Sequence, residues 1–134
     1  YDPKLLITCV DGEITIGDRK LKTDNPSRQI REILAGYRSP KLANLPSFTG
    51  GLVGYFSYDF LGYSEPSIRV ETEDTENFKD VDLMLFDKVI AFDNGLQKII
   101  LIVNIKLDDK DNIETEYNRA KREIMNMIDL LIFR

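Results

Sequence analysis

The sequence predicts an α+β fold, in which mainly antiparallel or mixed β-sheet layers carry two or more packed helices. Two turn signals, "DG" at 11–12 and "DNG" at 93–95, each join two strand-like segments and predict hairpins. Two amphipathic segments, one beginning near residue 26 and one near residue 112, predict helices. Hairpins form antiparallel pairs, and a helix with one apolar side is stabilised by covering a sheet face.

The first hairpin consists of "LLITCV" at 5–10 and "EITIGD" at 13–18. The first segment is apolar and rich in β-branched residues, as expected of a buried strand. In the second, Ile14 and Ile16 alternate with Glu13, Thr15 and Gly17, so one of its faces is exposed to water. We expect the one cysteine of this region, Cys9, to be a core residue.

The first helix has a clear start signal in Asp24-Asn25-Pro26, a capping side chain followed by proline at the first helical position. Its apolar stripe consists of Ile30, Ile33, Leu34 and Tyr37. Ser39-Pro40 ends the helix, and residues 40–48 are expected to form a loop.

The most unusual stretch is "FTGGLVGYFSYDF" at 48–60. Both alternating faces of residues 52–61 are mostly apolar, which predicts a central strand buried on two sides. Its three glycines indicate a bulge or the close approach of another backbone. An RNA-stacking strand would carry a leading basic residue, and a phosphate cradle would need a lysine and a following helix, so both are disfavoured. A ligand-contacting strand remains an alternative to a core strand in which Tyr58 and Asp59 only satisfy hydrogen bonds.

In the second half, the acidic segment 63–82 is expected to form a surface excursion, followed by one or two strands in "VDLMLFDKVIAFD". "KIILIVNI" is apolar at nearly every position and predicts a strand covered on both faces. A long helix capped by Asp111 or Asn112 ends the chain. Its apolar stripe consists of Ile113, Tyr117, Ala120, Ile124, Ile128 and Leu131.

Composition excludes several classes of function. The chain has 134 residues, a formal net charge of -5, one cysteine and no histidine. An acidic chain is a poor nucleic-acid binder, and neither a zinc site of the usual type nor histidine-based catalysis is available. We find no membrane span and expect a cytoplasmic protein, because a single free thiol fits a reducing compartment. Length predicts one domain over 1–134, and the missing initiator methionine suggests a fragment of a larger protein.

One family shares the ordered motifs of this chain. Gly50, Gly51, Gly54, Tyr55, Tyr58 and Asp59 form a Gly-Gly-x-x-Gly-Tyr-x-x-Tyr-Asp pattern, and "FDKVIAFDN" and "KIILIVNI" follow it. From about residue 24 to the last helix, the sequence resembles the N-terminal domain of anthranilate synthase component I. Para-aminobenzoate synthase component I is similar to it in the same region.

The resemblance implies a catalytically inert part of an enzyme that converts chorismate, with ammonia from a glutamine amidotransferase subunit, into anthranilate. It implies that the chorismate site and a Mg²⁺ ion belong to a C-terminal catalytic domain beyond residue 134. We therefore expect no catalytic, cofactor-binding or metal-binding residue in the chain.

The resemblance also implies a scaffold role and a contribution to a feedback pocket for L-tryptophan. Phe56, Tyr58 and Asp59 are the candidate framework residues of that pocket, chosen by their position on the predicted strand. The family's Leu-Leu-Glu-Ser effector motif is absent from this sequence, which leaves open whether tryptophan contacts any residue present. Two alternatives also remain: the para-aminobenzoate (folate-branch) enzyme, and a stand-alone interaction module without enzymatic activity.

Overall fold

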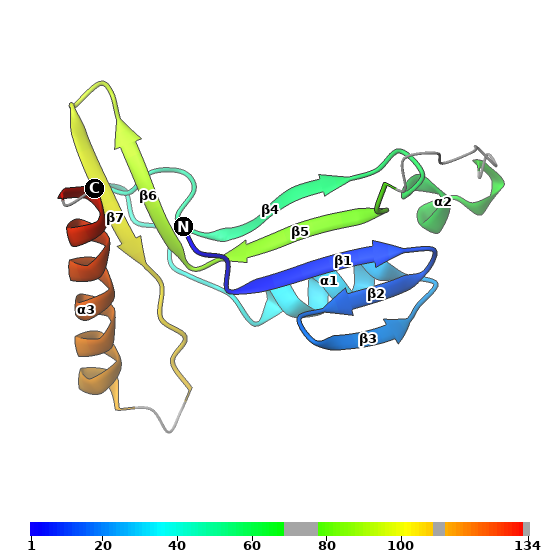
Figure 1. Ribbon diagram of the computed structural model, residues 1–134, viewed down its shortest axis with the longest axis horizontal. Coiled ribbons are helices and arrows are strands. Elements are labelled where there is room, and N and C mark those ends of the chain that lie inside the picture. Colours follow the sequence, from blue (N-terminus) through cyan, green and yellow to red (C-terminus); the bar gives the residue numbers. More distant parts are fainter. Residues whose placement is uncertain (69–77, 109–111, 133–134) are drawn as a thin grey trace. The chain divides into compact units, whose positions relative to one another are not determined.

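The computed structural model describes residues 1–68, 78–108 and 112–132, which fall into two compact units (Figure 1). The sheet unit comprises residues 3–38 and 52–85, and the hairpin unit comprises residues 1–2, 39–51 and 86–134. Both combine antiparallel strands with helices, so the predicted α+β fold is confirmed. The expectation of a single domain over 1–134 stays a prediction. No helix among the described residues is long and apolar enough to cross a bilayer.

The sheet unit is built on a five-stranded sheet. Its strands are β1 (Leu5–Val10), β2 (Glu13–Ile16), β3 (Arg19–Lys22), β4 (Gly51–Phe56) and β5 (Val81–Phe86), in the spatial order β3-β2-β1-β5-β4. The β1–β2, β2–β3 and β1–β5 pairs are antiparallel, and the arrows of β4 and β5 in Figure 1 point in opposite directions. Strands β2, β1 and β5 are therefore the interior strands of the described sheet, while β3 and β4 form its edges.

The β1–β2 hairpin forms as the sequence predicts. Asp11 and Gly12 connect the strands with positive φ angles of 47° and 75°, which is the backbone that a two-residue primed turn requires. The pairing of Val10 with Glu13 fixes the register, so that Cys9 faces Ile14 across the ladder. Cys9 is buried, which confirms the prediction that it is a core residue.

Strand β3 was not predicted, because its sequence "RKLK" carries one apolar residue among three cationic ones. Leu21 alone packs against the core, opposite Ile14. Basic side chains on an edge strand discourage pairing with another chain, and this edge is protected in that way.

Helix α1 (Pro26–Ala35) covers one face of the sheet. Between them lies a core cluster composed of Ile7, Cys9, Ile14, Ile30, Val81 and Leu83. Burying an aliphatic side chain of this size contributes about 1.5–3 kcal/mol, so this cluster is the main source of cohesion in the unit. The predicted helical stripe is right for Ile30 and Ile33, whereas Leu34 and Tyr37 lie near its end and are exposed.

The prediction for the glycine-rich strand was wrong in length and in burial. Strand β4 ends at Phe56, and the predicted continuation to Leu61 instead turns into the short helices α2 (Leu61–Ser64) and η1 (Pro66–Ile68). β4 is an edge strand, and Val53 and Tyr55 on its outer face are 44% and 40% exposed. On the other face Leu52 packs against the core, but Phe56 is 50% exposed, so neither face is covered along its whole length. The face of Val53 and Tyr55 is apolar, but no element of the described chain covers it.

Gly54 explains how β4 pairs with β5. Its φ angle is 151°, and a Cβ atom at this position would overlap the carbonyl oxygen of Asp82 and lie 2.9 Å from the Cα atom of Leu83. Both obstacles are backbone atoms, which cannot rotate away as a side chain can. The predicted close approach of another backbone is confirmed here, and β5 is that backbone.

The rest of the acidic segment is only partly described. Residues 61–68 form α2 and η1, and residue 81 already begins β5. Residues 69–77, on which most of the expected surface excursion falls, lie outside the described residues.

The hairpin unit contains β6 (Lys88–Asp93), β7 (Lys98–Val103) and α3 (Ile113–Ile132). β6 and β7 pair antiparallel from Lys88↔Val103 to Asp93↔Lys98, which confirms the second hairpin. In Figure 1, α3 runs alongside this hairpin. The expectation that β7 is covered on both faces was wrong for the described chain, because Ile99 is 50% exposed in a sheet of two strands.

Helix α3 begins at the predicted cap. The side-chain oxygen of Asn112 accepts hydrogen bonds from the backbone N–H groups of Glu114 (3.0 Å) and Thr115 (3.3 Å). Its buried residues are Ala120, which was predicted, and Met127, which was not. The apolar pattern of this helix is broad, and only the tertiary packing selects which side is buried.

We predict that Gly54→Ala destabilises the chain by about 2–4 kcal/mol, because β4 must move away from β5 to admit the methyl group. Urea unfolding followed by circular dichroism measures the change. The matched control is Gly95→Ala, where the added Cβ meets only the Asp93 side chain at 3.4 Å. Equal stability of the two variants would contradict the close approach.

Candidate functional site

The three predicted framework residues lie together where β4 ends. Phe56 is the last residue of the strand, and its ring lies 4.7 Å from the ring of Phe60 between centroids. Tyr58 is 81% exposed, and Asp59 is exposed as well. The expectation of a largely buried carboxylate at Asp59 was therefore wrong, because the chain leaves the sheet before this residue.

Tyr58 and Asp59 belong to a series of tight turns that follows Phe56 directly, residues 57–65, which we call the 57–65 turn. The N–H of Ser57 donates to the carbonyl oxygen of Asp80 (2.9 Å), and the Ser57 hydroxyl accepts from the N–H of Phe60 (3.2 Å). The carbonyl groups of Tyr58 and Asp59 accept hydrogen bonds from the N–H groups three residues later. The turn begins with a serine cap and leads directly into α2.

Tyr63 connects the 57–65 turn to the β1–β2 hairpin. Its hydroxyl accepts a hydrogen bond from the N–H of Gly12 (2.7 Å) and donates one to Oδ2 of Asp80 (2.6 Å). The Cys9 Sγ atom lies 3.8 Å from the same oxygen. One side chain thus joins its own turn to two segments that are far from it in the sequence, the β1–β2 hairpin and Asp80.

Asp80 is the centre of this polar network. Its Oδ2 atom also accepts from the N–H of Asp11 (2.9 Å), and its own N–H donates to the carbonyl oxygen of Cys9 (2.8 Å). Asp80 therefore holds the 57–65 turn at two places: its carbonyl oxygen accepts from Ser57 at the start, and its carboxylate accepts from Tyr63 near the end. Sequence reasoning missed Tyr63 and Asp80, because both lie in the acidic segment taken for a surface excursion. The one local signal is the three-residue spacing of Phe60 and Tyr63, which places both aromatic rings on one side of a helical turn.

Burial and the hydrogen bond to Asp80 raise the pKa of the Tyr63 phenol above its usual range. The hydroxyl therefore stays protonated and remains a hydrogen-bond donor. Burial likewise raises the pKa of the Cys9 thiol. A raised pKa makes the nucleophilic thiolate rarer, so Cys9 behaves as a core residue and not as a reactive one.

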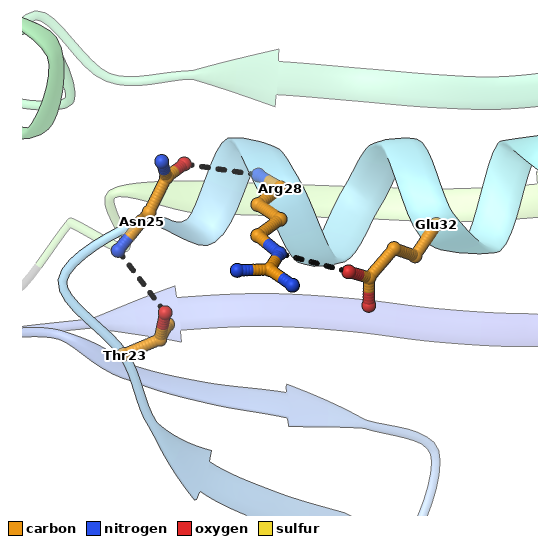
Figure 2. Close-up of polar contacts among 4 residues, drawn as sticks. All are labelled: Thr23, Asn25, Arg28 and Glu32. Carbon is orange, nitrogen blue, oxygen red and sulfur yellow. Dashed lines mark hydrogen bonds and ion pairs between the residues drawn. The ribbon is translucent and has the colours of Figure 1, made fainter.

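A cavity of about 710 Å³ opens at the start of α1, beside the same hairpin. It is lined by Asp11, Gly12, Lys22, Thr23, Asp24, Asn25, Arg28 and Gln29. Figure 2 shows the local contacts: Asn25 Oδ1 accepts from the N–H of Arg28 (3.0 Å), and the N–H of Asn25 donates to the Thr23 hydroxyl (3.0 Å). Arg28 in turn pairs with Glu32 at 3.0 Å. The helix end is thus satisfied by its own neighbours, and the lining carries charges of both signs.

The polar groups of the described residues satisfy one another. Among them, no buried side-chain nitrogen or oxygen lacks a hydrogen-bond partner. Within the same residues, no three His, Cys, Asp or Glu side chains are grouped as a metal site. The arrangement suits a framework: an α+β sheet-and-helix domain whose polar network holds an exposed aromatic and acidic turn in place.

Comparisons with known proteins identify the family. No family model matches the chain. It is 34% identical over 128 residues to anthranilate synthase component 1 of Acinetobacter calcoaceticus, an alignment that covers 89% of this chain and 25% of that protein. It is 33% identical to the same component of Pseudomonas aeruginosa over 98% of this chain. The chain belongs to the anthranilate synthase component I family, as the motifs around Gly50 and Asp59 indicate.

The fold agrees with this assignment. The crystal structure of anthranilate synthase component I from Streptococcus pneumoniae superimposes with a TM-score of 0.70, at 22% sequence identity, over 95% of this chain and 28% of that one. The chain spans about a quarter of the length of the curated relatives it matches.

We predict that Tyr63 makes stability fall at alkaline pH. Because its folded-state pKa is raised above the ordinary value of about 10, its stabilisation is complete below pH 10 and declines above it, by at most about 1.4 kcal/mol per pH unit. Urea unfolding at pH 8 and at pH 11 measures this. Tyr63→Phe should be less stable than the unchanged chain at pH 8, and the gap should narrow at pH 11. A gap that is constant or widens would contradict the prediction.

Proposed function

We propose that this chain is the N-terminal scaffold and regulatory domain of an anthranilate synthase component I. The observation that carries the proposal is its 34% identity, over nearly nine-tenths of its length, to a quarter of a component I protein. The full protein then acts as a lyase in tryptophan biosynthesis, where it forms anthranilate from chorismate and ammonia. A cytoplasmic location fits this role and remains a prediction.

The chemistry belongs to the remainder of that protein. The proposed reaction uses a Mg²⁺ ion, and the described residues offer no grouped carboxylates to bind one. The polar side chains of the Tyr63 network are already paired with one another. This supports a fragment that is catalytically inert and a chorismate-binding domain formed by the C-terminal part of the same polypeptide.

The uncovered face of the five-stranded sheet supports the scaffold role. Opposite the helix-covered face, apolar side chains from β1, from β4 and from the residues preceding β5 are exposed: Leu6, Val10, Val53, Tyr55 and Phe78. The rings of Tyr55 and Phe78 lie 6.5 Å apart between centroids, and exposed apolar side chains grouped in this way usually mark an interface. The C-terminal domain of the same chain is the proposed occupant. In the hairpin unit, Met125 and Ile132 lie seven positions apart on one side of α3 and are both exposed, which is consistent with a further interface.

The regulatory role rests on the 57–65 turn. We place Phe56, Tyr58 and Asp59 in the framework of a pocket for L-tryptophan, whose other contacts come from residues outside this chain. The exposure of Tyr58 and Asp59 supports this, because an effector or a second domain can reach both side chains. Tryptophan binding then favours an orientation of the two domains in which the catalytic domain is less productive.

A glutamine amidotransferase subunit that supplies ammonia is the remaining proposed partner. The described residues give no specific sign of where it binds.

The function is tested with the complete polypeptide and its amidotransferase partner, assayed separately for anthranilate and for para-aminobenzoate from chorismate. Anthranilate formation that tryptophan inhibits supports the proposal. Formation of the para-aminobenzoate precursor would assign the chain to the folate branch. If neither product forms and a partner protein binds instead, the interaction module is the better interpretation.

We predict that Tyr58→Ala and Asp59→Asn in the complete polypeptide weaken inhibition by tryptophan by about fivefold or more, the effect of losing a contact worth about 1 kcal/mol. The kcat and KM for chorismate without tryptophan should change by less than about twofold, because neither side chain is part of the reacting centre. Leu42→Ala, an exposed residue in the 39–51 segment, serves as the control. Unchanged inhibition in both variants, with normal folding, rules out the framework role.

A further inference from the structure

We propose that Tyr63 is the positioning residue of the 57–65 turn, and that its hydroxyl fixes the direction in which Tyr58 and Asp59 point away from the sheet. The inference rests on the proposed function, because those two residues belong to the candidate framework of the effector pocket. It adds a residue that does not contact the effector and yet sets how well the framework is preformed.

The 57–65 turn cannot hold its shape without such an anchor. Its regular part, α2, is four residues long, and an isolated helix shorter than about 12 residues is marginal in water. The local hydrogen bonds fix single turns but do not fix how the segment lies on the sheet. The backbone bond from Ser57 to Asp80 fixes where the segment starts, and beyond that point its orientation comes from side chains that reach other elements.

Two side chains of the turn point inward, and they anchor it in different ways. Phe60 and Tyr63 both pack against the core cluster, and their rings lie 5.5 Å apart between centroids. Packing of the Phe60 ring against the core is not directional. It holds the turn against the sheet but does not prevent the turn from rotating on it. The Tyr63 hydroxyl adds two hydrogen bonds in different directions, and these define an orientation.

The atoms that hold this hydroxyl are themselves fixed. Gly12 lies in the tight turn between β1 and β2, and its carbonyl oxygen accepts from the N–H of Thr23 (2.8 Å). Asp80 is held by its backbone bond to Cys9 and by the N–H of Asp11 on its carboxylate. The hydroxyl thus joins the turn to two rigid points, and the carboxylate makes one of its bonds charge-assisted.

On the opposite side of the same turn, Tyr58 and Leu61 are exposed, as is Asp59. An ordered turn presents these side chains in one arrangement. A loosened turn presents several, and an effector that needs one of them binds more weakly in proportion to the population of that arrangement. Loss of the hydroxyl should therefore reduce effector sensitivity without any change at the effector contacts.

The test is Tyr63→Phe in the complete polypeptide, which keeps the ring packing and removes both hydrogen bonds. Amide hydrogen exchange reports the opening of the turn, and steady-state kinetics report kcat, KM for chorismate and the inhibition constant for tryptophan. The matched control is Tyr37→Phe, because the Tyr37 hydroxyl makes no hydrogen bond in the described part of the chain and its ring keeps its contact with Lys4. Asp80→Asn provides a milder variant that keeps an acceptor oxygen at the same place.

We expect exchange at residues 60–65 and at Gly12 to rise about fivefold or more in Tyr63→Phe, with unchanged exchange in β1 and β5, since each of the two net hydrogen bonds lost is worth about 1 kcal/mol. The tryptophan inhibition constant should rise by a similar factor, with kcat and KM unaltered. Asp80→Asn should give a smaller change of the same kind, and Tyr37→Phe should give none.

Unchanged exchange at residues 60–65 would overturn the positioning role. Increased exchange with unaltered inhibition, in a protein whose inhibition does respond to Tyr58→Ala, would overturn the link between Tyr63 and the effector while the proposed function stands. If inhibition responds to neither Tyr58→Ala nor Asp59→Asn, the framework role of those residues is ruled out. The positioning role of Tyr63 is then supported or overturned by the exchange data alone.

Discussion

The absence of a side chain at Gly54 is the constraint on which the candidate site depends. The carbonyl group of Asp82 occupies the space that any other residue at this position would need for its Cβ atom. Because glycine has no Cβ atom, β4 can lie directly against β5. The N–H of Ser57 then reaches the carbonyl oxygen of Asp80 at the end of the pairing. The place where the chain leaves the sheet is fixed in this way, and the 57–65 turn starts from that fixed point.

The five-stranded sheet is asymmetric in a way that suits a framework. One face is closed by α1 and a core of aliphatic side chains, which gives the unit its cohesion. The other face carries exposed apolar residues, and the two edges differ: β3 is lined by Arg19, Lys20 and Lys22, whereas β4 has no charged residue. Charge protects one edge against association, and the β4 edge with its neighbouring face is left open for a partner. A covered side and an open apolar side fit the proposed scaffold role.

The candidate site was only partly accessible to sequence reasoning. Phe56, Tyr58 and Asp59 could be chosen because they are neighbours in one motif. Tyr63 and Asp80 could not, because their roles depend on contacts across 51 residues to Gly12 and 69 residues to Asp11. Contacts between residues so far apart produce no periodic pattern or fixed spacing that the sequence would show. The prediction that β4 is buried on both sides failed for a related reason. Apolar composition indicates that a face can be covered, but not whether an element of the same chain covers it.

The sequence by itself determined the local elements and the family. The Asp11-Gly12 turn, the Asn25 and Asn112 caps and the apolar periods of the helices act between residues close in the chain, where backbone sterics and nearby hydrogen bonds decide the outcome. Only the tertiary structure decided the edge position of β4, the buried side of α3 and the enclosure of the Tyr63 hydroxyl. Each of these depends on which distant surfaces meet, because burial and hydrogen-bond satisfaction are properties of an assembled neighbourhood and not of a stretch of chain.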